Sequence, residues 1–335
     1  MIVSPPESSD RDLALRALRP RPFPHEIIAL IYVIAGVVLL ERLPVTYPRR
    51  ALWQAYLTFF GPIVLLAYFL SRLVRRRRSD STPREDMAVL GRIGAVLALT
   101  LPVHFLLKSF IFLINPRTWD LELSAWDQAL HFGISPSRFL VALFRNPIFL
   151  HGLDIAYSAA YYFFIVGTTA ACFALLSHRM RFVLGSSYML LWMFGAILYL
   201  AFPSWGPVFV FSNDFRSPLA HMPITRSIQH QLFLEISSLV NDPLGRRIVR
   251  FGSVAAFPSL HVGEVLLLAL ASRAISKRWF VWNVVFLALI VIGSVVSGYH
   301  YLIDAYGGVA IALLSWWLGN KLFPKPPAAS PSRPQ

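Results

Sequence analysis

Apolar runs alternate with short polar or basic segments along the whole chain of 335 residues. Eight runs stand out, at about 27–43, 51–73, 88–114, 153–176, 182–201, 258–275, 279–297 and 300–321. Each is close to the roughly 20 residues that a helix needs to cross a bilayer. The pattern predicts an all-α, polytopic integral membrane helix bundle with about eight transmembrane helices, the last six of which form its core.

Two longer segments interrupt this alternation. Residues 115–150 mix aromatic and charged side chains, which predicts short helices along the membrane interface. Residues 202–256 are more polar and predict a long loop with an amphipathic helix near 224–240. The predicted organisation has four parts: a disordered cytoplasmic N-terminus (1–26), an N-terminal transmembrane pair with a basic cytoplasmic loop (27–87), a six-helix membrane domain (88–322) and a disordered Pro- and Ser-rich tail (323–335).

Composition supports a membrane protein. Hydrophobic residues make up 56% of the chain and charged residues 14%, whereas soluble domains have about 25% charged residues. The net charge of +14 does not indicate nucleic-acid binding, because the basic residues cluster in short segments between apolar runs. Cys172 is the one cysteine, so the chain forms no internal disulfide.

The basic segments also predict an orientation. Residues 72–84, 178–181, 273–278 and 321–325 fall on the same side as the N-terminus, and basic short loops favour the cytoplasm. The loop at 41–50, with three arginines, falls outside and is an exception. We therefore expect both termini in the cytoplasm and a plasma (inner) membrane location.

Two histidines and an aspartate are the candidate catalytic residues. His261 begins the run at 258–275, and His300 follows the end of the next run. Because the chain crosses and returns between them, both fall at the same, extracytoplasmic face. Asp304 lies four residues after His300, on the same side of a helix that starts there. One imidazole could attack phosphorus, the carboxylate could orient it, and the second imidazole could protonate the leaving oxygen. Imidazole suits both tasks because its unperturbed pKa of about 6.5 lies near operating pH.

The residues before His261 favour anion binding. Pro258 suits the first turn of a helix, and the Ser259 hydroxyl with the free N–H groups of that turn forms a natural anion site. Each motif alone is also typical of an interfacial histidine or a common His/carboxylate pair. Together at one membrane face they favour catalysis. Glu264, three residues after His261, shares its side of the helix and is a supporting candidate.

Three elements resemble a known family. Phe257-Pro258-Ser259-Leu260-His261 matches a Pro-Ser-x-His element, residues 298–304 followed by Gly307-Gly308 match a His-Tyr-x-x-Asp element, and residues 199–207 match a Tyr- and Pro-rich element. More weakly, Leu153-Asp154 with Tyr161-Tyr162 matches an upstream element. Over about 115–321 the chain resembles the type-2 phosphatidic acid phosphatase superfamily. It looks most like the branch of inositol phosphorylceramide synthases (Aur-type) and their bacterial relatives.

The resemblance implies a role for each matching residue. His300 would be the nucleophile that becomes phosphohistidine, Asp304 would orient it, and His261 would act as acid and then base. Ser259 would hold phosphate oxygens, and Asp154, Tyr199 and Gly206 would contact substrate. The resemblance implies no metal and no cofactor.

The chain departs from the family pattern at the phosphate site. The best-known phosphatases carry an Arg six residues before the nucleophilic His, where this chain has Ser294, and a Lys-x6-Arg-Pro element that is missing here. Other cations must then meet the phosphate charge. Arg250 is the first choice and Arg216 the second, with Arg246, Arg247 and Lys108 as further candidates. Alternatively, the arginines contact lipid headgroups.

These observations favour a phosphotransferase that moves a phosphoryl or phospho-headgroup from a lipid donor to a lipid or polar alcohol acceptor, with no nucleic-acid partner. Three alternatives remain. The first is a phosphatase acting on phosphatidic acid or a polyprenyl diphosphate. The second is a lipid transporter or flippase. The third is a metal-dependent hydrolase with His261, His300 and Asp304 as ligands.

Overall fold

The protein is an all-helical bundle, seen in a computed structural model that describes residues 8–43, 66, 69–70, 82–241 and 254–325. Every regular element in these residues is a helix, which confirms the predicted all-α fold. Five helices of the described chain are long and apolar enough to cross a membrane. They are α4 (Pro83–Ser109), the continuous helix of α8, η1 and α9 (Pro147–Leu175), α10 (His178–Ala201), α15 (Lys277–Val296) and α16 (Leu302–Leu322).

The other three predicted crossings do not reach this length in the described residues. Two correspond to the shorter apolar helices α2 (Pro24–Leu40) and α14 (Leu260–Ser272). With 13 residues, α14 rises only about 20 Å, less than the roughly 30 Å of a bilayer core. The crossing predicted at 51–73 lies almost entirely outside the described residues. The described residues therefore show five candidate spans, and the other three predicted crossings are not shown.

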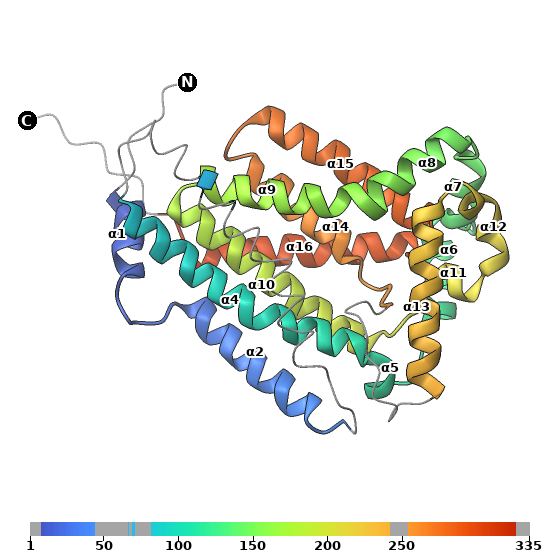
Figure 1. The fold of residues 1–335 in the computed structure, drawn as a ribbon, viewed down its shortest axis with the longest axis horizontal. Coiled ribbons are helices and arrows are strands. Elements are labelled where there is room, and N and C mark those ends of the chain that lie inside the picture. The colour runs from blue at the N-terminus through green and yellow to red at the C-terminus, as the bar shows by residue number, and fades with distance from the viewer. Residues whose placement is uncertain (1–7, 44–65, 67–68, 71–81, 242–253, 326–335) are drawn as a thin grey trace, which may run out of the picture.

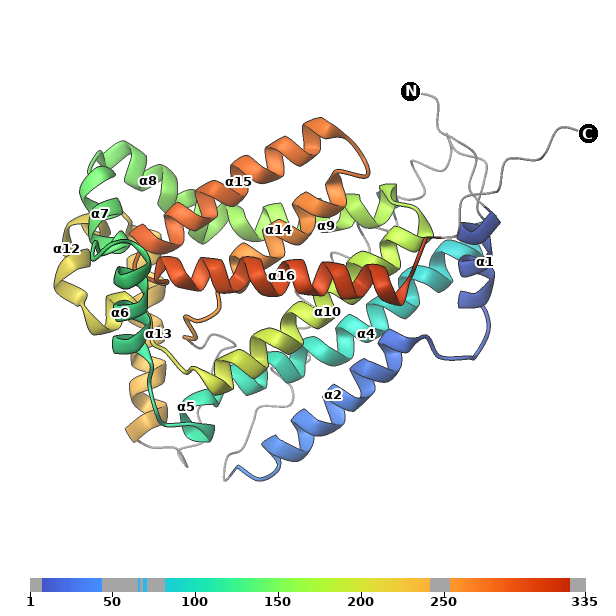
Figure 2. The ribbon, with the colours of Figure 1, turned by 180° about the vertical axis from the view of Figure 1, so that it is seen from behind.

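Helix α10 is the central element of the bundle. It packs against α4, α14 and α16, and every residue from Phe182 to Trp192 is buried. Within α10, the Ser187 hydroxyl donates a hydrogen bond to the Val183 carbonyl, four residues earlier, at 2.7 Å. Around it, α14 also packs against α9, α15 and α16, while α2 covers α4 (Figures 1 and 2).

Side-chain caps set where several helices begin. Ser177 accepts a hydrogen bond from the Met180 N–H at the start of α10, and Ser276 accepts one from Trp279 at the start of α15. Asn146 precedes Pro147 and accepts from two N–H groups of α8. Serine and asparagine side chains accept hydrogen bonds from N–H groups that have no partner within the helix, so they fix the residue at which each helix begins.

Five short helices and the longer α13 of the described chain gather at one end of the bundle. They are α5 (Ile111–Ile114), α6 (Asp120–Leu130), α7 (Pro136–Leu143), α11 (Pro207–Val210), α12 (Ser212–Ala220) and α13 (Pro223–Asn241). Helix α13 coincides with the amphipathic helix predicted near 224–240, and it runs across the end of the bundle (Figures 1 and 2). The predicted short helices at 115–150 appear as α6 and α7, whereas α8 belongs to a long span.

Residues 8–26 are packed helix and turn, in contrast to the predicted disorder. Helix α1 (Ser8–Ala17) lies against α4 and α10 at the end opposite α6 and α7 (Figure 1). The Asp10 carboxylate accepts hydrogen bonds from the N–H groups of His178 and Arg179, at 3.0 and 2.8 Å. Phe23 is buried against Phe182, as is Phe323, the first residue of the tail. These apolar and capping contacts order the segment despite its Pro- and Arg-rich composition; residues 326–335 lie outside the described chain.

Candidate active site

His300 and Asp304 form a buried pair at the start of α16. The Nδ1 atom of His300 lies 3.3 Å from Oδ2 of Asp304, and both residues are at most 5% exposed. The same carboxylate oxygen accepts the Tyr301 N–H at 2.9 Å, which places Asp304 in the first turn. A carboxylate only accepts hydrogen bonds, so it favours the imidazole tautomer with hydrogen on Nδ1. Nε2 of His300 then keeps the lone pair that a nucleophile needs.

His261 faces His300 from the first turn of α14. The two ring centroids are 6.1 Å apart, and the rings meet edge to face. Tyr157 and Tyr161 pack against His261 at 5.3 and 4.6 Å between ring centroids. Tyr157 lies within a π-helical segment, Ala156–Ala160, and Tyr161 directly follows it; segments of this kind are frequent at functional sites.

Backbone contacts tie the two histidine-bearing helices together. The Ser259 N–H donates to the Asp304 carbonyl at 2.9 Å. Gly308 lies so close to Ser259 that a Cβ there would overlap the Ser259 carbonyl oxygen. Small residues allow membrane helices to approach in this way. The position of His261 relative to His300 therefore depends on main-chain packing.

Both histidines line a cavity of about 440 Å³. Its walls come from α4, η1, α9, α10, α13 and α14, and aromatic and aliphatic side chains dominate. Below His261, Glu264 accepts hydrogen bonds from the Tyr161 hydroxyl at 2.5 Å and from Trp192 Nε1 at 2.8 Å. Lys108 lines the same cavity, with Nζ 5.5 Å from the centroid of the Tyr199 ring. The cavity thus combines an apolar wall with a few buried polar groups, as ligand sites usually do.

Two carboxylates of α6 hold the segment that presents His300. Asp127 accepts hydrogen bonds from the first N–H groups of α16, those of Leu302 and Ile303, at 3.1 and 3.0 Å. Asp120 accepts from the Tyr301 hydroxyl at 3.2 Å and from the N–H groups of the turn at 205–206. Burial raises the pKa of both carboxyl groups, while these hydrogen bonds act against the rise.

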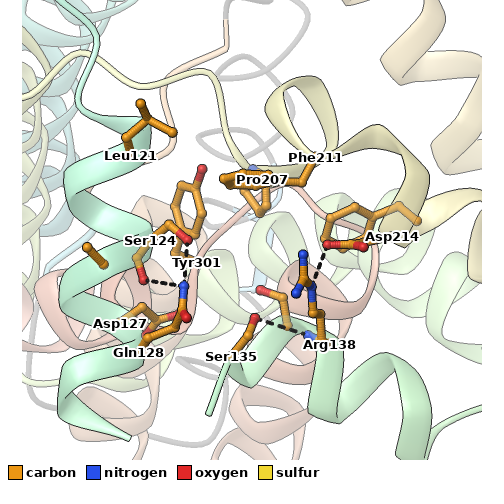
Figure 3. A pocket seen from close by; sticks show the side chains of 13 residues that line it. Leu121, Ser124, Asp127, Gln128, Ser135, Arg138, Pro207, Phe211, Asp214 and Tyr301 are labelled. Carbon is orange, nitrogen blue, oxygen red and sulfur yellow. Dashed lines mark hydrogen bonds and ion pairs between the residues drawn. The ribbon is translucent and has the colours of Figure 1, made fainter. Parts of the chain in front are cut away.

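A second, smaller pocket of about 250 Å³ borders this segment, with Asp127 and Tyr301 in its lining (Figure 3). In Figure 3, Arg138 pairs with Asp214 at 2.8 Å, and Gln128 bonds to Ser124 on α6. Tyr301 lines this pocket whereas His300 lines the larger cavity, so neighbouring residues border both spaces. The second pocket contains neither histidine of the candidate site.

The remaining predicted site residues are placed differently from one another. Tyr199 lines the cavity. The fully buried Asp154 instead caps α13, because its two oxygens accept the N–H groups of Ile224 and Thr225. Gly206 has φ of +96°, donates its N–H to Asp120 and lies against the Tyr299 carbonyl, so it supports the segment that presents His300 from outside the cavity.

The predicted phosphate ligands are not brought to the cavity in the described chain. Ser259 is buried, and its Oγ has no hydrogen-bond partner among the described residues, but it is not part of the cavity lining. Arg216 is exposed on α12 and does not line the cavity that contains His261 and His300. Arg250, with Arg246 and Arg247, lies outside the described residues.

Sequence reasoning overlooked several residues of this region. Asp120 and Asp127 are seven residues apart and so share one face of α6, a spacing that could have indicated a paired role. Tyr157 and His104 carry no comparable signal, because only the packing of η1 and α4 brings them to the cavity. His104 Nδ1 lies 2.9 Å from the Trp192 carbonyl.

Comparison with known proteins identifies the family. The sequence model of the PAP2 superfamily matches residues 121–318, more than half of the chain. The chain therefore belongs to the PAP2 superfamily and is an integral membrane lipid phosphatase or phosphotransferase. Enzymes of this superfamily are generally metal-independent. No curated protein and no solved structure matches the chain.

The geometry does not favour the metal-dependent alternative. Within the described ranges, no three His, Cys, Asp or Glu side chains are placed so that they could hold a metal ion.

Proposed function

We propose that this protein is a phosphotransferase that moves a phosphoryl or phospho-headgroup, such as phosphoinositol, from a lipid donor to a lipid or polar alcohol. One observation carries the proposal: the His300–Asp304 pair faces His261 in a cavity of the membrane domain. Family membership supplies the substrate class, a lipid phosphate.

The reaction would proceed in two displacements through phosphohistidine. Nε2 of His300 attacks phosphorus, the bond from phosphorus to the leaving alcohol breaks, and His261 gives that oxygen a proton. Asp304 stabilises the positive imidazole ring of His300. His261 then takes a proton from the acceptor hydroxyl, whose oxygen bonds to phosphorus as the N–P bond breaks. Neither step needs a metal or a cofactor.

The lining of the cavity supports transfer to an alcohol over hydrolysis. Aromatic and aliphatic side chains line it, and Ile228 and Leu232 of α13 contribute from the end of the bundle. Such walls suit the chain of a lipid alcohol and disfavour bulk water. Hydrolysis of phosphatidic acid or a polyprenyl diphosphate is the second candidate, because it uses the same phosphohistidine. Transport is disfavoured because the candidate groups gather near the α6–α7 end of the bundle.

We further propose eight crossings with both termini in the cytoplasm of a plasma (inner) membrane. The site would then open to the extracytoplasmic face. Since Cys172 is buried, single surface cysteines offer a clean test. An impermeant maleimide added to intact cells should label Ser212→Cys on α12 but not Arg273→Cys after α14. The reverse labelling would refute the orientation.

Turnover of defined lipids tests the function. Wild type, His300→Ala and the control His151→Ala, an exposed histidine on α8, would be purified in detergent with EDTA. Each would receive phosphatidic acid, a polyprenyl diphosphate, or phosphatidylinositol with and without ceramide. A new phospholipid formed by wild type and the control but not by His300→Ala supports transfer. Free phosphate alone supports the phosphatase, and equal inactivity of wild type and His300→Ala on every substrate refutes the proposal for these donors.

A further inference from the structure

A lysine and a glutamate line the same cavity as the two histidines. Lys108 comes from α4, one turn after His104, so both face the cavity. Glu264 comes from α14, three residues after His261. The ammonium group of Lys108 interacts electrostatically with the Glu264 carboxylate, and both groups line the cavity that contains the candidate proton donor, His261.

The surroundings hold both groups in place. Two hydrogen bonds, from Tyr161 and Trp192, fix the Glu264 carboxylate. The Lys108 ammonium lies over the Tyr199 ring, at a distance typical of a cation–π contact. Ionisable side chains within membrane spans are costly and are usually kept for function. Packing α4 against α10 would need no such pair.

The phosphate of a substrate needs a cation at this depth. A phosphate anion leaving water loses its hydration, and a nearby positive charge must offset that loss. Among the described residues that line the cavity, Lys108 is the one lysine or arginine. Arg216 is exposed on α12, and Ser294, at the position of the family's arginine, is buried and donates to the Val291 carbonyl.

We infer that Lys108 binds the phosphate of the lipid substrate beside His261, and that Glu264 positions the ammonium group. The inference rests on the proposed function for the identity of the ligand. It also places part of the substrate site on α4, which precedes the matched region 121–318. A helix outside the family's common segment would therefore complete the phosphate site of this chain.

The test compares Lys108→Gln, Lys108→Arg and the double variant Lys108→Gln/Glu264→Gln. Lys321→Gln is the control, because Lys321 also lies over an aromatic ring, that of Trp317, but on α16 outside the cavity. The dissociation constant of orthovanadate, a phosphate mimic, would be measured by thermal shift. KM and kcat would be measured with the lipid donor that the turnover experiment identifies. The melting temperature without ligand reports folding.

Lys108→Gln should raise the vanadate dissociation constant and the donor KM by about tenfold or more, as expected for a lost charge-assisted hydrogen bond. Lys108→Arg should stay within about threefold of wild type, since it keeps the charge. The double variant removes both charges, so it should fold like wild type yet bind vanadate weakly. A merely structural pair predicts that the double variant recovers vanadate binding, and that result would overturn the inference.

The binding assay separates this inference from the proposed function. If wild type binds vanadate but turns over none of the lipids, the lipid reaction fails while the Lys108 variants still decide the anion site. If wild type turns over lipid and Lys108→Gln matches it in KM and vanadate binding, the inference fails alone. Absence of vanadate binding by wild type also overturns it.

Discussion

Replacing Gly308 by alanine tests whether main-chain contact sets the geometry of the two histidines. The added Cβ would overlap the carbonyl oxygen of Ser259. Because a C···O contact needs about 3.3 Å, α14 and α16 must move apart by about 1 Å. Overpacking of this kind costs about 1–3 kcal/mol, offset by about 1 kcal/mol from the better helix propensity of alanine. We expect a net loss of up to about 2 kcal/mol in stability.

The effect on catalysis should exceed the effect on folding. His261 lies two residues after Ser259, so it moves away from His300 with that backbone. A displacement of about 1 Å in a reacting pair can cost about 100-fold in rate. We therefore expect kcat for Gly308→Ala to fall by about that factor, while the protein still folds.

The assay needs kcat with the lipid donor and the melting temperature of purified protein. Gly167→Ala is a matched control, because Gly167 is also helical but has no atom within 4 Å of a Cβ built there. This control should keep wild-type kcat and equal or exceed wild-type stability. Wild-type kcat and melting temperature in Gly308→Ala would refute the argument that backbone contact fixes the site.

Three further predictions concern separate parts of the chain. His261→Ala should lower kcat on an alkyl donor by about 10²–10⁴-fold, but should still give a burst of p-nitrophenol from a p-nitrophenyl phosphodiester, whose leaving group needs no proton; His300→Ala should give no burst. Burial raises the pKa of Asp120, so its protonation favours the folded state, and this contribution falls as the pH rises above the unfolded value of about 4. Asp120→Asn should thus flatten the curve of melting temperature against pH between about pH 4 and 7, and an unchanged slope would contradict the assignment. Asp10→Ala should cost about 1 kcal/mol of stability by uncapping α10 yet leave kcat unchanged, whereas exposed Asp12→Ala should change neither; equal melting temperatures would count against the cap.

Apolar runs and motif spacing could predict the helices and the meeting of the two histidines. The length of an apolar run predicts a membrane-spanning helix. Because the chain crosses and crosses back between His261 and His300, the two histidines must lie at the same end of the bundle. Span lengths were less predictable, because α14 ends at Ser272 although apolar residues flank its end. The order of residues 8–26 depends on Asp10 reaching α10, a contact between segments far apart in sequence.

The supporting residues of the site were beyond sequence reasoning for the same reason. Asp154 resembles a substrate ligand by its position, yet its oxygens are used to cap α13. Lys108 and Glu264 lie 156 positions apart, and only the packing of both α4 and α14 against α10 brings them to one cavity. Hydrophobic periodicity identifies which helices exist, but it does not say which of their faces meet.

The close approach of α14 and α16 gives the cavity two kinds of wall. One edge, from Ser259 to Gly308, is joined by main-chain contact and carries both histidines. The part of the wall from α13, with Ile228 and Leu232, belongs to a helix that packs mainly against α8, α12 and η1. Reaction chemistry and lipid choice are thus structurally separable here. Exchanging residues such as Ile228 and Leu232 would reshape the accepted lipid while the reacting groups keep their spacing, which makes this wall the natural place to engineer new acceptors.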